Sequence, residues 1–383
     1  MKKGSVVPQG IELRRAEGME TVILSRGALK EILITVRPDD GMDLQALLEK
    51  AWAVVRAEGA TVLRQEVFGV ASIPDEVERS ALRDVCGEVD WPVTWLDEGK
   101  SPGARLTGTH VHAVSGVPVR RLALDGEAVG SVFSDGVAEY GHLGGIVSLN
   151  PGGDRKQQTR DVLERIEAAA ALAGMTFGNV VRTWFYLDHI LDWYDDFNAV
   201  RTQFFTERGV FDGLVPASTG VGGGNRHGAA LVAEALAVRA LPGHENELCV
   251  KEVSSPLQCP ATAYRSSFSR AVEITCQGHR RLTISGTASI APEGHTARIG
   301  DVAGQMDLTL DVVQALLESR GLSWRDASRA IAYVKAEGDA AIFRERAESR
   351  RLPPFPLLFA ENDICRTDLL FELELDAISL NSA

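Results

Sequence analysis

The sequence QTRDVLERIEAAAALAGMTFGNVVRTWFYL, residues 158–187, returns in altered form as QMDLTLDVVQALLESRGLSWRDASRAIAYV, residues 305–334. The two stretches align without a gap at an offset of 147 residues (305 − 158 and 329 − 182). Apolar residues three and four apart predict a helix in the first half, the glycine marks its end, and the β-branched and aromatic run predicts a strand. This offset is the length of a domain rather than of a solenoid repeat, so the chain contains a tandem duplication.

Length and composition set the class of protein. The 383 residues are enough for about two or three domains, and 45% hydrophobic with 24% charged residues is a globular composition. A formal net charge of −13 without a Lys/Arg run disfavours a nucleic-acid partner. No apolar run approaches the length of about 18 residues that a membrane helix needs, and the N-terminus lacks a signal-peptide core. The five cysteines lie outside any C-x-x-C pair, as reduced thiols do, so we expect a cytoplasmic protein with no membrane contact.

The pattern divides the chain into three consecutive units, at residues 1–115, 116–245 and 246–383. The first unit repeats the order strand, helix, glycine, strand, although residue identity is nearly gone. It is either a third, degenerate copy or an unrelated element. Residues 74–103 have no evident counterpart in the repeats, so we interpret them as a peripheral helix with its loop or as an insertion over the site.

The order of elements predicts the fold class. The middle and last units read as β-β-α-β-α-β, which is typical of α+β units with a mixed sheet and helices on one face. Because the uncovered sheet faces must be buried against one another, we expect three such units to form an intramolecular pseudo-trimer. The glycine-rich segment at 215–225 is interpreted as a wide irregular loop, and the alternative is that its glycines let the backbone approach a ligand closely. It is not a nucleotide-binding loop, since no Lys follows it at phosphate-loop spacing and a strand rather than a helix comes next.

At this point the residues carry a family resemblance. The middle and last units resemble the Rid/YjgF (chorismate-mutase-like) fold family, whose members are small homotrimers with sites between subunits. The shared features are Gln158-Thr, Gly174 followed by Val180-Val-Arg-x-x-x-Tyr-Leu, a Phe-rich second helix and a Pro-Ala-Ser loop. Imine deaminases of this family hold the substrate carboxylate with an Arg directly after Pro-Ala. This chain has Ser218 there, which argues against imine deamination.

A narrower resemblance is to the chorismatases, which are tandem Rid-like single chains. It extends from about residue 140 to residue 378, and one position departs from it, because Phe185 stands where the family has Asn after Arg-Thr-Trp. A sister group is therefore an alternative. The segments that carry the resemblance are YRSSFSRA (264–271), ISGTA (284–288), GDVAGQ (300–305) and DICRTDLLFE (363–372).

The resemblance implies a hydrolase or lyase that needs no cofactor. Its substrate would be chorismate or a similar cyclic carboxylate, and its products pyruvate and a hydroxybenzoate or dihydrodiol acid. Protonation of the vinyl ether requires a carboxylic acid of raised pKa in a dry pocket, and Glu372 is the family match. Strand alternation places Glu372, Glu374 and Asp376 on one face, which is also compatible with a solvated edge.

The remaining site residues follow from the same resemblance. Two substrate carboxylates need cations, and the candidates are Arg182, Arg265 and Arg270, with Tyr264 as a hydroxyl donor. Arg329 repeats Arg182, so that position can equally be structural. We expect Ser285 and Gly286 to contact the substrate and Cys365 to act in catalysis. Among chorismatases, Gly and Cys at the positions of Gly286 and Cys365 accompany 3-hydroxybenzoate-type products, whereas Ala at both positions accompanies plain hydrolysis.

Other constellations are weak. His110 and His112 form the closest histidine pair, and with no acidic or Cys residue beside them we expect no metal site.

We expect the substrate pocket to lie between the middle and last units. The last unit has the longer loop beside the Ser-Gly-Thr strand, with 20 residues from 285 to 305 against 10 from 148 to 158, whereas the middle unit has the glycine-rich segment.

The expected partner is a small-molecule carboxylate, and the expected assembly is a monomeric pseudo-trimer or a higher homo-oligomer. Two alternatives to the chorismatase-like function stay open. One is a Rid-type enzyme related to the enamine/imine deaminases, and the other is a non-catalytic Rid-fold protein that binds a small ligand.

Overall fold

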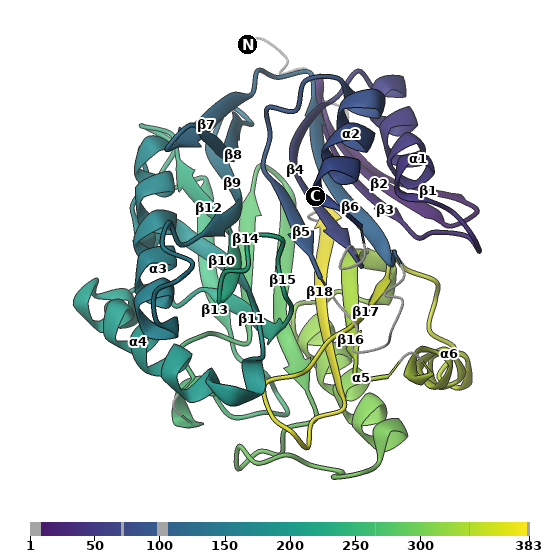
Figure 1. Cartoon of the computed structure of the whole chain (residues 1–383), viewed down its shortest axis with the longest axis vertical. Coiled ribbons are helices and arrows are strands. Elements are labelled where there is room, and N and C mark those ends of the chain that lie inside the picture. Colours follow the sequence, from purple (N-terminus) through teal and green to yellow (C-terminus); the bar gives the residue numbers. More distant parts are fainter. Residues whose placement is uncertain (1–8, 70–72, 98–105, 265, 337, 381–383) are drawn as a thin grey trace, which may run out of the picture.

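The structure is a computed structural model that describes residues 9–69, 73–97, 106–264, 266–336 and 338–380. In these residues the strands form three six-stranded sheets, and six α-helices lie on the outside of them (Figure 1). This confirms the α+β class and the tandem Rid-like units with mixed sheets. None of the described helices is both long and apolar enough to span a membrane.

The first unit forms one sheet from three strands, two helix–strand steps and a closing strand. These elements are β1 (Gln9–Ala16), β2 (Met19–Arg26), β3 (Leu29–Val36), α1 (Leu44–Ala57), β4 (Thr61–Phe68), α2 (Asp75–Cys86), β5 (Val93–Leu96) and β6 (Gly108–Ser115). The strand order is β1-β2-β3-β6-β4-β5, and only β4 and β5 are parallel neighbours. Asp43 caps α1, because its side chain accepts a hydrogen bond from Ala46 N.

The middle unit repeats this order. Its elements are β7 (Arg120–Leu124), β8 (Glu127–Ser134), β9 (Ala138–Val147), α3 (Arg155–Leu172), β10 (Val180–Leu187), α4 (Tyr194–Glu207), β11 (Ala217–Gly222) and β12 (Leu231–Ala240). Asp154 caps α3, and the apolar stripe of this helix, including Val162, Leu163 and Ile166, is buried against the sheet. The predicted helix and strand of the repeat are therefore present.

The last unit has the same order again. Its elements are β13 (Leu248–Val253), β14 (Ala271–Cys276), β15 (His279–Ala288), α5 (Val302–Ser319), β16 (Ala327–Val334), α6 (Asp339–Ser349), β17 (Leu358–Glu361) and β18 (Phe371–Leu380). In all three sheets the fourth and fifth strands of the unit are parallel and the other neighbours antiparallel. The expected β-β-α-β-α-β order was thus too short, since each unit has three strands before its first helix and a short strand after its second.

Two expectations need correction. Residues 74–97 do have a counterpart in the other units, because α2 and β5 occupy the places of α4 and β11 and of α6 and β17. The glycine-rich segment is not a loop, because β11 pairs in parallel with β10. Small residues are required there, since a Cβ on Gly222 would lie 3.0 Å from Asp363 of the last unit. The division into separate domains at residues 115 and 245 stays a prediction.

Buried charges join the three units around a common axis. Arg64, Arg182 and Arg329 occupy the same place in their sheets, directly after a register shift of the fourth strand. Each pairs with a glutamate of the next unit. These pairs, which we call the axial ring, are Arg64–Glu234 (2.5 Å), Arg182–Glu374 (3.0 Å) and Arg329–Glu66 (2.9 Å). The cyclic order of the contacts, first to middle, middle to last and last to first, is that of a pseudo-threefold arrangement.

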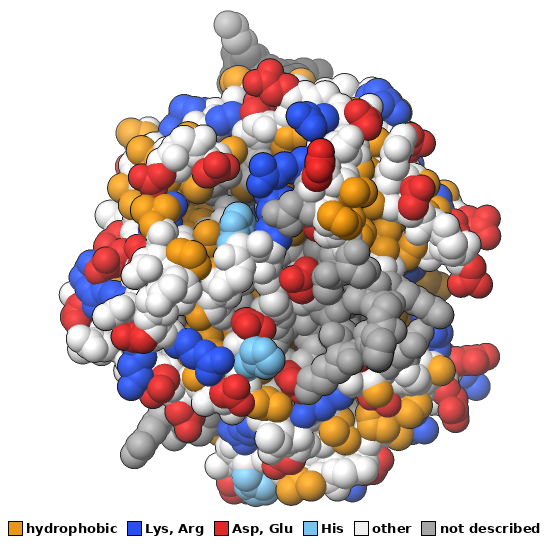
Figure 2. All heavy atoms as spheres, in the orientation of Figure 1, with side chains coloured by type: hydrophobic (Ala, Val, Ile, Leu, Met, Phe, Trp, Pro, Cys, Tyr) orange, Lys and Arg blue, Asp and Glu red, His pale blue; other side chains and the backbone are white. Residues whose placement is uncertain are grey.

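The outer surface differs from this charged axis. On the face shown in Figure 2, acidic side chains are interspersed among the basic ones rather than separated from them. This distribution accompanies the overall charge of −13 and gives the described part of that face no extended basic surface.

Candidate active site

A cavity of about 50 Å³ lies between the middle and last units. The middle unit contributes Tyr194 and Arg201 of α4 and two residues of β11, and the last unit contributes the rest of the wall. Four residues that the sequence placed together do line this one cavity: Arg270, Gly286, Cys365 and Glu372. Position and lining therefore match the expected interface pocket, while the roles of the residues stay predictions.

Glu372 is the buried acid of this cavity. It lies on β18 and is 4% exposed. Burial, and after it the neighbouring Glu374, raise the pKa of its carboxyl, whereas Arg182 and Arg270 act in the opposite direction, and the net result is a pKa of about 8. The carboxyl therefore carries a proton at neutral pH, which is the state that a general acid needs.

Gly286 makes room for this acid. A Cβ at this position would overlap Oε1 of Glu372 and would lie 2.9 Å from its Cδ. The Gly286 N–H donates to Thr219 Oγ1 (3.0 Å), which fixes the strand against the middle unit. The absence of a side chain, rather than a contact of its own with substrate, is what this residue provides.

Three arginines, Arg201, Arg270 and Arg366, line the cavity, and the first two are buried. Arg201 is 1% exposed; its Nη2 donates to Asn198 Oδ1 (2.6 Å), its Nη1 lies 3.4 Å from Ser218 Oγ, and its Cζ lies 4.9 Å from the ring centre of Phe197. Arg270 is held by the Cys259 carbonyl, which accepts from its Nε (3.1 Å) and Nη2 (3.0 Å). Guanidinium groups fixed in this way are suited to bind carboxylates.

Arg201 was missed by the sequence reasoning. It lies on the buried side of α4, four residues after Phe197 and three before Phe204. A charged side chain within an apolar helical stripe is the signal that could have identified it. Its guanidinium stands beside Ser218, the position at which imine deaminases of the resembled family carry their Arg.

Cys365 is a neutral thiol in this environment. Burial and the neighbouring Glu372 raise its pKa to about 12. A thiol nucleophile acts as its thiolate, so the side chain contributes shape and polarisability rather than a ready nucleophile. Burial also raises the pKa of Tyr194, which keeps its phenol protonated.

The other predicted site residues lie elsewhere. Arg182 is 1% exposed and donates from Nη2 to Thr219 Oγ1 (2.7 Å) and to Glu374, behind the cavity wall. The Ser285 hydroxyl donates to the Ser269 carbonyl (2.6 Å) and accepts from Ser218 N (2.8 Å), so it joins two units. This geometry does not support direct contact of either with a substrate.

Two further predicted residues cannot be placed. The side chain of Tyr264 and the whole of Arg265 are outside the described residues.

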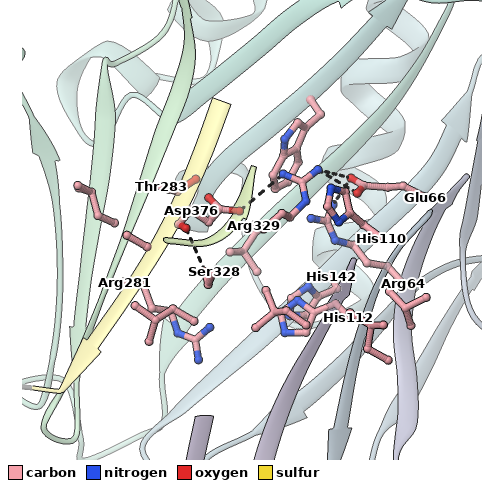
Figure 3. Close-up of a pocket in the computed structure, with 18 of the residues that line it drawn as sticks. Arg64, Glu66, His110, His112, His142, Arg281, Thr283, Ser328, Arg329 and Asp376 are labelled. Carbon is pink, nitrogen blue, oxygen red and sulfur yellow. Dashed lines mark hydrogen bonds and ion pairs between the residues drawn. The ribbon is translucent and has the colours of Figure 1, made fainter. Parts of the chain in front are cut away.

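A second cavity, of about 60 Å³, lies where the three sheets meet (Figure 3). His110 and His112 of the first unit and His142 of the middle unit line it, and burial lowers the pKa of all three imidazoles. Its glutamate, Glu66, pairs with Arg329, which lowers the pKa of that carboxyl. This cavity thus holds a paired glutamate and histidines that burial keeps neutral.

In the described part of the chain, no group of three or more His, Cys, Asp and Glu side chains is arranged to hold a metal ion. Within the interface cavity, Glu372 is the carboxyl whose pKa is raised.

The comparisons with known proteins agree with this geometry. The sequence model of the family described as Endoribonuclease L-PSP matches residues 140–226, in the middle unit. A chorismatase of Streptomyces rapamycinicus is 28% identical over 259 residues, which cover 61% of this chain and 73% of that protein. A 3-hydroxybenzoate synthase of Streptomyces hygroscopicus is 25% identical over 302 residues, 69% of this chain and 85% of that protein.

A solved structure shows the same fold. The crystal structure of a chorismatase superposes with a TM-score of 0.62 at 21% identity, covering 91% of this chain and 98% of the other. The chain is thus a chorismatase-like protein of the tandem Rid fold.

Proposed function

We propose that the chain cleaves the enolpyruvyl ether of chorismate, or of a similar cyclic carboxylate, to pyruvate and a ring product, with Glu372 as general acid. The observation that carries this proposal is a buried carboxyl whose pKa is raised to about 8, in a cavity that three arginines also line. The similarity to a chorismatase and to a 3-hydroxybenzoate synthase supports the choice of substrate.

The chemistry follows from the position of the proton. Glu372 donates its proton to the methylene carbon of the vinyl ether, and the adjacent carbon becomes an oxocarbenium centre. Water adds to that centre and returns a proton to the Glu372 carboxylate. The resulting hemiketal collapses to pyruvate and a ring hydroxyl, so that all atoms and charges balance. General-acid catalysis of this kind contributes on the order of 10²–10⁴ in rate.

The arginines account for binding. Arg201 and Arg270 approach the cavity from different units, and a substrate with two carboxylates can engage both. Gly286 and Cys365 are the residues that accompany 3-hydroxybenzoate-type products in the resembled family. The hydroxybenzoate is therefore the proposed ring product, and its formation needs one further step, in which the ring loses its allylic hydroxyl and a ring proton as water and becomes aromatic. Without that elimination the steps above yield the dihydrodiol acid, which is the alternative product.

The experiment is a direct assay. Purified protein is incubated with chorismate, pyruvate is measured with lactate dehydrogenase, and the ring product is identified by chromatography and mass spectrometry. Wild-type protein should release pyruvate, and Glu372→Gln should lower kcat by about 10²-fold or more while leaving the fold and ligand affinity close to normal.

Each other outcome has a clear meaning. Absence of pyruvate with wild-type protein would overturn the proposal. Binding of chorismate without turnover would favour the non-catalytic, ligand-binding alternative, and equal turnover by Glu372→Gln would remove that residue from its role.

A further inference from the structure

Glu374 lies two residues beyond Glu372 on the same face of β18 and is fully buried. Four donors face its two oxygens. Oε2 accepts from Arg182 Nη2 (3.0 Å) and Thr219 Oγ1 (2.5 Å), and Oε1 accepts from Trp184 Nε1 (3.0 Å) and Arg329 Nη1 (2.6 Å). Only a carboxylate anion satisfies four donors, because a protonated carboxyl would turn its own hydrogen toward one of them.

Thr219 connects this anion to the glycine that makes room for the acid. Its hydroxyl donates to Glu374 and accepts from the Gly286 N–H (3.0 Å). We call this arrangement the threonine clasp. It holds the anion, the backbone of β15 and the acid of β18 in one rigid group.

The same clasp is present at another junction of the molecule. Between the first and middle units, the Thr94 hydroxyl donates to Glu234 and accepts from the Gly145 N–H (3.0 Å). Thr94 and Thr219 occupy the same register, opposite Glu66 and Trp184 respectively. The clasp is therefore a repeated feature of the interfaces and is not by itself a feature of the candidate site.

What differs between the two junctions is the residue beside the anion. Glu372 pairs with Tyr333, and at the same place Val232 pairs with Tyr186, 147 residues earlier than Tyr333. A buried glutamate thus has an acid as its neighbour at one junction and an apolar residue at the other. The two glutamates differ in charge, because burial and the neighbouring Glu66 raise the pKa of Glu234 well above its ordinary value. The junction at Glu234 therefore serves as a control for changing the glutamate of a clasp where no acid lies beside it.

We propose that Glu374, held by the threonine clasp, is a positioning residue that keeps the proton on Glu372, and that Arg182 limits this effect. The inference rests on the proposed function of Glu372 as general acid. Two negative charges on one face of a buried strand repel each other strongly, because little water lies between them to screen the repulsion. A nearby guanidinium acts in the opposite sense. The directions in which Glu374 and Arg182 move the pKa of Glu372 agree with this geometry.

This role matters during the catalytic cycle. After Glu372 has given its proton to the methylene carbon, its carboxylate stands beside the Glu374 anion. The repulsion favours return of the proton that the attacking water releases. Glu374 touches neither substrate nor reacting atoms in this scheme and acts only through Glu372.

The test uses two charge-removing variants with opposite expected effects. Glu374→Gln should move the alkaline limb of kcat/KM to lower pH by about one unit, because the repelling charge is gone. Arg182→Gln should move that limb to higher pH. A merely structural role would not shift the alkaline limb in a defined direction. Glu374→Asp keeps the negative charge, so its alkaline limb should lie at the same pH as that of the wild-type protein.

The control changes the glutamate at the equivalent place in another junction. Glu234→Gln alters the clasp between the first and middle units, where Val232 replaces the acid, and should leave the pH limb unchanged. Unshifted limbs in both charge variants, or an equal shift in Glu234→Gln, would overturn the inference. If Glu374→Gln does not fold, the upward shift in Arg182→Gln decides, and no shift there overturns it.

A second measurement separates this inference from the proposed function. With carboxyl-¹³C glutamate, the titration of Glu372 is followed by NMR in the protein without substrate, and Glu372→Gln assigns its signal. The Glu372 titration should move to lower pH in Glu374→Gln even if wild-type protein proves inactive on chorismate. An unchanged titration would refute the positioning role whatever the substrate.

Discussion

At the scale of single residues, the candidate site depends on a missing side chain as much as on those present. Glu372 occupies the space that a Cβ of Gly286 would need. The carboxyl is thereby packed against backbone, which keeps water away and raises its pKa. Gly286, which has no side chain, thus helps to determine whether the Glu372 carboxyl is protonated.

Gly286→Ala tests this directly. The new methyl group overlaps Oε1 of Glu372, so the carboxyl has to rotate away or β15 has to shift. We expect kcat to fall by about 10²-fold, the scale of a misplaced catalytic group. The measurement is steady-state pyruvate release. The matched control is Gly141→Ala in β9, where the nearest atoms lie 3.8 Å from the added Cβ, and it should leave kcat unchanged. Unchanged turnover in Gly286→Ala would show that the acid tolerates the methyl group.

The residues of the site divide into those that a motif can reveal and those that it cannot. Glu372, Gly286 and Cys365 stand in short segments of one unit that resemble chorismatase motifs, so their grouping was predictable. Arg201 comes from a helix of another unit, with no motif around it, and only the packing of two units brings it to the cavity. Arg182 shows the reverse case, because the buried arginine of a family pattern turns out to pair with Glu374 behind the wall.

At the scale of elements, β11 shows why the sequence was misread. Glycine and serine disfavour strands, so the segment resembled a loop. Its neighbours decide otherwise, because β10 pairs with it and the Gly222 N–H donates to the Asp363 carbonyl (2.7 Å) across the interface. Local propensity indicates the helices and the aromatic strands of this fold well, but not a strand whose small residues are required by another unit.

The junction at β11 also predicts a stability effect. Ser285→Ala removes the hydroxyl that donates to Ser269 O and accepts from Ser218 N, and leaves both backbone groups without this partner. We expect a loss of about 2 kcal/mol in the free energy of unfolding, measured by urea denaturation. Ser379→Ala is the control, because that buried hydroxyl has no hydrogen-bond partner among the described residues. Equal effects of the two substitutions would argue against the proposed importance of the junction.

At the scale of the whole molecule, buried histidines and buried acids give stability a defined pH dependence. Burial lowers the pKa of four imidazoles, those of His110, His112, His142 and His279, the last to about 3. Below pH 6.5 the unfolded chain protonates these groups and the folded chain does not, so the free energy of unfolding falls as the pH drops. The buried neutral histidines therefore make the folded protein sensitive to acid.

Glu372 and Glu234 act in the opposite direction. Their pKa values are raised, that of Glu372 to about 8, so the folded chain keeps protons that the unfolded chain loses near pH 4.5. Their contribution declines as the pH rises from 4.5 to 8. Between pH 4.5 and 6.5 four histidines outweigh two glutamates, and above pH 6.5 the glutamates alone change, which places the maximum of stability near pH 6.5.

Thermal unfolding across this pH range tests the expectation. Each group changes the slope by at most about 1.4 kcal/mol per pH unit. His142→Phe should flatten the rise of stability on the acid side, whereas Glu372→Gln should flatten the decline above pH 6.5 and steepen the rise between pH 4.5 and 6.5. His189→Gln alters an exposed imidazole and should change neither side. A stability that stays constant from pH 5 to 6.5 would contradict the buried neutral state of the histidines.

The cyclic contact of three unlike units in one polypeptide has a consequence for how such a protein can change. In a ring of three identical subunits, one substitution changes all three junctions, so an acid introduced for catalysis would be present three times. Here the place of Glu372 is taken by Val232 and Gly108 in the other units, opposite Tyr186 and Phe68. One junction can therefore acquire catalytic residues while the other two keep residues that only hold the units together. Because all walls of the site belong to one chain, dilution cannot separate them.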